Sequence, residues 1–158
     1  MRTLGRVAYD SSEARRELLE GLAEAIDEIG FALASLGAAY EQLDEASADR
    51  LEEELFGPVQ TAYGRAKRTH TEFADRHRLE SRQFELGSPG APSVRAKGHI
   101  DSAVDAIGAA DGALATVQDS PAFPEVGDVE LRAGLSGVRE LLGVVRGNAR
   151  ELTRGLGR

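Results

Sequence analysis

A stripe of large apolar residues between positions 22 and 43 constrains the fold more than any other feature of the sequence. Its members are separated alternately by four and three residues: Leu22, Ile26, Ile29, Leu33, Leu36, Tyr40 and Leu43. This spacing places all of them on one face of an α-helix. Glu24, Asp27 and Glu28 fall outside that face, where they would meet water. A face this regular has to be buried against other helices, so the stripe predicts a helical bundle.

Three later segments repeat the pattern and supply the partners. We expect helices over residues 11–46, 48–79, 94–119 and 128–155, separated by segments rich in Gly, Pro and Ser. Short connections between amphipathic helices favour antiparallel neighbours. The predicted fold is therefore all-α, a single antiparallel up-down-up-down four-helix bundle formed by residues 1–158.

The boundary between the first two helices has two candidate positions. Ser47 followed by an acidic turn is typical of a helix start, whereas Gly57 followed by Pro58 is typical of a helix end. We prefer the break at Ser47, because it gives four helices of comparable length. Pro58 would then be a kink inside the second helix.

Composition excludes several classes of protein. The 158 residues include no cysteine, which excludes disulfides, thiolate nucleophiles and Cys-ligated metals. No apolar run approaches the ~18 residues of a membrane span, and the first residues do not resemble a secretory signal, so we expect a cytoplasmic protein. Arginine greatly outnumbers lysine, as is typical of proteins from GC-rich bacterial genomes.

Charge is unevenly distributed along the sequence. The net charge of -8 argues against nucleic-acid binding, which depends on clustered Lys and Arg. Residues 1–55 carry a net charge of -9, but residues 56–100 carry +4. The candidates for binding an anion or an acidic partner surface lie in this second region: Arg76, Arg78, Arg82, Arg95 and Lys97. The same residues are equally typical of solvated helix ends.

The histidines raise the question of a metal site. If residues 87–92 form a hairpin turn between the second and third helices, His77 and His99 come within about one helical turn of each other, with Asp75 and Asp101 near the same level. These four residues are the candidate metal ligands. However, the Glu-x-x-His pairs of di-iron bundles are absent, which favours ordinary structural histidines.

Glycines inside the last two helices are unexpected, because glycine costs about 1 kcal/mol relative to alanine in a helix. Gly108 and Gly112 share one helix face, and so do Gly143 and Gly147. We expect them to allow close packing within the chain, with Gly112 opposite residues 134–137. The alternative is a shallow interface where a partner helix docks.

No catalytic motif and no cofactor fingerprint is recognisable in the sequence. The sequence therefore favours a non-enzymatic helical-bundle protein that works through protein–protein interaction. Its expected partner is another copy of itself, as a homo-oligomer, or another helical protein for which it is an adaptor or scaffold. The alternative is a bundle that binds a small anion or a metal at its basic, histidine-containing end.

Overall fold

The computed structural model describes the backbone of residues 2–156 and the side chains of residues 11–152 and Arg154, and it confirms the all-α class. No β-strand occurs in residues 2–156. The elements are α1 (Arg2–Tyr40), α2 (Glu45–Leu51), the π-helical segment η1 (Glu52–Phe56), α3 (Gly57–Arg76), α4 (Ala96–Asp119), α5 (Phe123–Val126) and α6 (Val129–Leu156).

The break between the first two helices lies earlier than either predicted position. α1 ends at Tyr40, and the carboxylate of Asp44 caps α2 by accepting a hydrogen bond from the backbone N–H of Ser47 at 2.8 Å. Ser47 is thus the N3 residue of the cap, and the capping residue is Asp44. α1 also begins at Arg2 rather than near Ser11.

Pro58 lies within a continuous helical segment, as predicted, and a π-helical turn precedes it. The N–H of Gly57 bonds the carbonyl of Glu52, one residue further back than in an α-helix. Proline has no N–H, so Pro58 cannot donate to the carbonyl of Glu54. Asn148 of α6 donates its side-chain amide to that carbonyl instead, at 2.9 Å. The missing backbone bond is thus replaced from a neighbouring helix.

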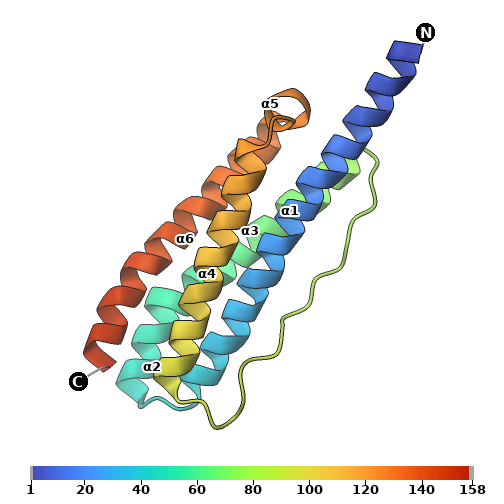
Figure 1. The fold of residues 1–158 in the computed structure, drawn as a ribbon. Helices are drawn as coiled ribbons and strands as arrows, with labels where there is room; N and C mark the ends of the chain where they lie inside the picture. Colours follow the sequence, from blue (N-terminus) through green and yellow to red (C-terminus); the bar gives the residue numbers. More distant parts are fainter. Residues whose placement is uncertain (1, 157–158) are drawn as a thin grey trace.

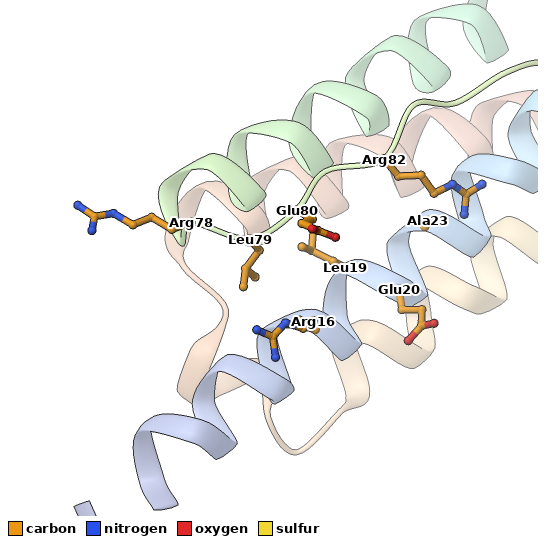
Figure 2. Close-up of a pocket in the computed structure, with 8 residues that line it drawn as sticks. All are labelled: Arg16, Leu19, Glu20, Ala23, Arg78, Leu79, Glu80 and Arg82. Atoms are coloured by element: carbon orange, nitrogen blue, oxygen red, sulfur yellow. The ribbon is translucent and has the colours of Figure 1, made fainter. Parts of the chain in front are cut away.

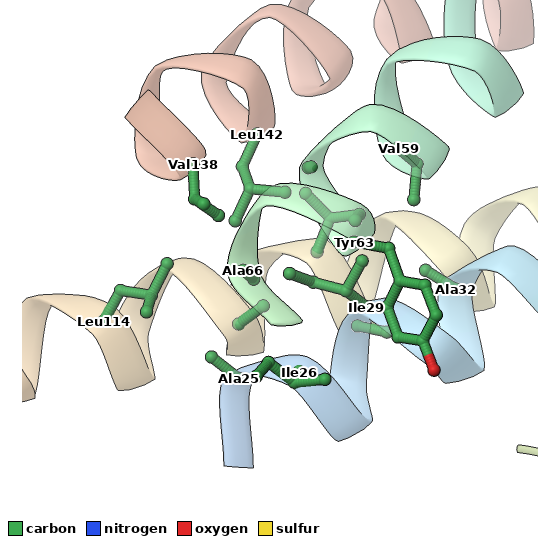
Figure 3. Packing of buried hydrophobic residues seen from close by; sticks show 14 of the residues in the cluster. Ala25, Ile26, Ile29, Ala32, Val59, Tyr63, Ala66, Leu114, Val138 and Leu142 are labelled. Carbon is green, nitrogen blue, oxygen red and sulfur yellow. The ribbon is translucent and has the colours of Figure 1, made fainter. Parts of the chain in front are cut away.

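The apolar stripe of α1 forms the centre of the core. Five of its residues are buried: Leu22, Ile26, Ile29, Leu33 and Leu36. Figure 3 shows Ile26 and Ile29 close to Ala66 of α3, with Leu114 of α4 and Leu142 of α6 in the same cluster. The last two members of the stripe are less buried, because Tyr40 is 41% exposed at the end of α1 and Leu43 follows that end.

The order of the helices in space differs from the predicted bundle. α1 and α6 lie on opposite corners, and each contacts both α3 and α4. Figure 1 shows α3 and α4 running in the same direction, opposite to α1 and α6. The up-down-up-down order is therefore not what this chain adopts. Its second and third long helices are parallel and sit diagonally across the bundle.

A long extended segment makes this order possible. Residues 78–94, here called the strap, return along α1 from one end of the bundle to the other (Figure 1). Its path is marked by Arg82 paired with Asp27, Gly87 against Phe31, and the side-chain amide of Gln42 donating to the carbonyl of Val94 at 2.7 Å. An extended chain of this length reaches about 55 Å, more than the rise of about 36 Å along α4. The expected hairpin at residues 87–92 is therefore wrong.

Candidate functional site

The basic residues that adjoin the predicted loop do not form one cluster. Arg76 ends α3, where Nε and Nη2 donate to the two carboxylate oxygens of Asp128, both at 2.8 Å. His77 contacts the same carboxylate through Nε2 at 2.9 Å. Asp128 also accepts from the N–H of Leu131, so it caps α6 while it neutralises Arg76.

The environment of Asp128 fixes its ionisation. Burial raises the pKa of this carboxyl, but the hydrogen bonds from Arg76, Leu131 and His77 outweigh burial and hold the pKa at about 2, against 3.8 for an ordinary aspartate. The carboxylate is therefore charged at any physiological pH. Arg76 is committed to this contact, and the hydrogen bond that it donates to Asp128 raises the pKa of its guanidinium.

Arg78 lies beside a hollow on the described surface. This hollow has a volume of about 530 Å³ and lies between α1 and the first residues of the strap. In Figure 2, Arg16 and Arg78 lie on two sides of Leu79, and the guanidinium of Arg78 points outward. Glu20 and Glu80 line the same hollow, so its acidic and basic side chains nearly balance.

The other three basic candidates lie along the strap or beyond it. Arg82 pairs with Asp27 of α1 and stacks over the ring of Phe84, with 4.6 Å from the guanidinium carbon to the ring centroid. Arg95 immediately precedes α4, and Lys97 pairs with Asp101 at 3.2 Å. Arg76 and Lys97 therefore lie at opposite ends of the bundle. Three of the five predicted residues already contact carboxylates of their own chain.

The candidate metal ligands are also separated. His77 is bonded to Asp128 at the end of α3, whereas His99 lies in the first turn of α4, under Gly90 of the strap. Asp101 faces Lys97, and Asp75 is exposed. Among the described residues, no group of three or more His, Cys, Asp or Glu side chains is placed to hold a metal ion. The proximity of His77 and His99 depended on the hairpin that the strap replaces.

The two glycine pairs, Gly108 and Gly112 of α4 and Gly143 and Gly147 of α6, are not close-packed against other described residues. A Cβ added at Gly108, Gly112, Gly143 or Gly147 would meet no atom within 4 Å among the described neighbours. Gly134 and Gly137, expected opposite Gly112, face α3 instead. A Cβ at Gly137 would lie 2.9 Å from Arg65, and one at Gly134 would overlap Thr69.

A charged network that the sequence does not predict lies between these glycine pairs. Arg139 of α6 donates to Asp111 of α4 through Nε at 2.8 Å and to Gln118 at 2.7 Å. Arg146 approaches the same aspartate at 3.7 Å. These residues are 21 to 35 positions apart and meet only because α4 and α6 are antiparallel neighbours. Sequence spacing carries no signal for such a pairing.

Comparisons of the chain with protein-family models, with curated proteins and with solved structures find no match. None of the helices within residues 2–156 combines the length and apolar composition needed to cross a bilayer.

Proposed function

We propose that this chain acts without catalysis, through protein–protein contact, and that its partner is a second copy of itself. The contact would be made by the α4–α6 face, which we define as Gly108, Gly112, Gly143, Val144 and Gly147. The observation that carries the proposal is the open space in front of the four glycines.

The four glycines destabilise their helices, and no contact among the described residues requires them. Each costs about 1 kcal/mol relative to alanine in a helix interior. A methyl group would fit at all four positions without touching another part of the described molecule. A neighbouring molecule that approaches the backbone closely would account for the absence of side chains, because small residues let helices pack at short distance.

The face has complementary features on the same helix, which favours self-association over a different partner. Val144 is 51% exposed and follows Gly143 directly in the sequence, beside the open space at Gly143 and Gly147. A two-fold axis through this region would place the valine of each protomer against the glycines of the other. Such reciprocal contacts are what an isologous dimer interface requires.

The charges beside this face support docking as well. Asp111 is bonded to Arg139 and approached by Arg146 within the protomer. Because the aspartate already has its partners, covering it would not leave an unpaired buried carboxylate, which is the main electrostatic penalty of burying a charged surface.

The test is the oligomeric state of leucine variants, measured by sedimentation velocity over a range of protein concentrations. Gly143→Leu and Gly147→Leu should weaken self-association at least tenfold, because the side chain fills the space that Val144 would enter. The fold should be retained, since both positions are open in the protomer. The matched control is Gly37→Leu on α1, a glycine that also meets nothing within 4 Å but lies outside the proposed face.

Two results would overturn the proposal. One is a wild-type protein that stays monomeric at all concentrations tested. The other is a self-association that survives in Gly147→Leu, or that is lost equally in Gly37→Leu, because neither result would place the contact on the α4–α6 face.

A further inference from the structure

The strap is held along α1 by side chains rather than by its backbone. Residues 80–90 form no backbone–backbone hydrogen bond with the described part of the chain. The ends of the strap do form main-chain hydrogen bonds, among them Leu79 N–H to the carbonyl of Ala74, and the side-chain amide of Gln42 donates to the carbonyl of Val94. A segment with few backbone bonds and mostly exposed side chains can open locally at low cost in free energy.

One aromatic contact anchors the middle of the strap. The ring of Phe84 packs edge-on against the ring of His70 of α3, with centroids 5.1 Å apart and an interplanar angle of 85°. Arg82 lies over the ring of Phe84 and pairs with Asp27 of α1. His70, Phe84, Arg82 and Asp27 thus connect α3, the strap and α1 in one continuous contact.

His70, which the strap contacts through Phe84, is a buried titratable residue. It is only 3% exposed, and its Nδ1 has no hydrogen-bond partner in the described chain. Burial lowers the pKa of this imidazole, and the positive charge of Arg82 lowers it further. An imidazolium here would be desolvated and would be repelled by the positive charge of Arg82, so a neutral His70 favours the closed strap.

We propose that the strap detaches from α1 and α3 at acidic pH, when His70 takes up a proton. With the strap lifted, water can reach the imidazolium and Arg82 can move away from it. Because the pKa of His70 is lower in the closed form than the ordinary value of 6.5, the closed form has its full stability above pH 6.5. Its population decreases as the pH falls below that value. The ratio of open to closed strap should rise by up to tenfold per pH unit in that range.

Two other histidines touch the ends of the strap and must be separated from His70. His99 is 2% exposed beneath Gly90, and its Nδ1 is also without a partner in the described chain. His77 precedes the strap and is bonded to Asp128. Neither contacts Phe84 in the aromatic packing that holds the middle of the strap.

The absence of cysteine makes a direct distance measurement possible. Spin labels are attached at Ser88→Cys on the strap and Ala109→Cys on α4, both exposed positions, and the distance distribution is measured by pulsed electron paramagnetic resonance at pH 7.5 and pH 5.0. The distribution should broaden and shift at pH 5.0. A control pair at Glu24→Cys and Ala109→Cys, on two helices, should not change, which excludes global unfolding.

Substitutions of the histidines assign the effect. His70→Phe keeps an aromatic ring against Phe84 but cannot take up a proton, so the pH response should disappear. His70→Gln is the second variant, in case the larger ring disturbs the fold, and it should also be unresponsive. His77→Gln and His99→Gln should retain the response. The proposal is overturned if the wild-type strap does not move by pH 5.0, or if the response persists without His70 or depends on His99.

Discussion

At the scale of single residues, Arg78 occupies a backbone conformation that glycine adopts more readily. It has φ 54°, the one positive value at a non-glycine residue in the described chain. The N–H of Leu79 reaches the carbonyl of Ala74, and the N–H of Arg78 reaches that of Asp75, which together form a Schellman motif at the end of α3. Glycine is the usual residue at the position that Arg78 holds.

Arg78→Gly should therefore raise the free energy of unfolding by about 1 kcal/mol, because the left-handed conformation penalises a Cβ. Urea denaturation followed by circular dichroism measures the change. Arg78→Ala is the control and should give no such gain, since alanine keeps the Cβ. Equal stabilisation by both variants would point to the loss of the arginine side chain rather than to the backbone.

Asp128 links stability to pH through its lowered pKa. The folded-state pKa of about 2 lies below the ordinary 3.8, so the stabilisation is complete above about pH 4 and is lost as the pH falls towards 2. Asp128→Asn should lower the free energy of unfolding by about 2 kcal/mol at pH 7. Urea denaturation at a series of pH values should show this deficit shrinking towards zero as the pH approaches 2.

The control for this carboxylate is Glu130→Gln. Glu130 also approaches Arg76, but at 4.0 Å and with a largely exposed side chain. An exposed ion pair of this kind contributes little. If Glu130→Gln had the same pH-dependent effect as Asp128→Asn, the stabilisation would come from general charge balance around Arg76 and not from the capping carboxylate.

At the scale of elements, the π-helical segment and α6 depend on each other. Asn148 supplies the donor that Pro58 lacks, so the two positions should be energetically coupled. Asn148→Ala should cost about 1–2 kcal/mol, because the carbonyl of Glu54 is left without a partner. In a Pro58→Ala background the cost should be smaller, since alanine restores a backbone N–H at the α-helical position.

The measurement is a double-mutant cycle of four proteins compared by urea denaturation. A coupling energy near zero would show that the amide of Asn148 does not replace the missing backbone donor. Asn148→Asp is a useful further comparison, because it keeps the size of the side chain but removes its donor capacity.

At the scale of the whole molecule, the sequence predicts the faces of the helices but not their neighbours. The stripe at Leu22, Ile26 and Ile29 identifies what is buried, and the structure confirms it. It does not identify α4 as the main partner of α1. That assignment depends on the path of each connection, and the sequence of residues 80–93 does not distinguish a compact hairpin turn from a segment that runs the length of the bundle.

The predicted proximity of His77 and His99 depends on the same connection. The sequence analysis interprets the residues between the second and third long helices as a hairpin turn, whereas an extended chain advances about 3.3 Å per residue and carries the start of α4 to the other end of the bundle. His77 and His99 were expected together on that interpretation, and the structure places them at opposite ends. Gly108, Gly112, Gly143 and Gly147 can be recognised from the sequence, but only the structure shows that no other side chain of the described chain covers them.

The crossover made by the strap has a consequence for synthesis on the ribosome. α1 packs most extensively on α4, which is completed about forty residues after α3. At a synthesis rate of about 5–20 residues per second, about 2–8 s pass between the completion of α3 and that of α4, and during this time only part of the apolar stripe of α1 is covered. A nascent chain with this order of helices therefore exposes the apolar stripe of α1 early in synthesis. We expect a chaperone that binds emerging apolar helices to bind α1.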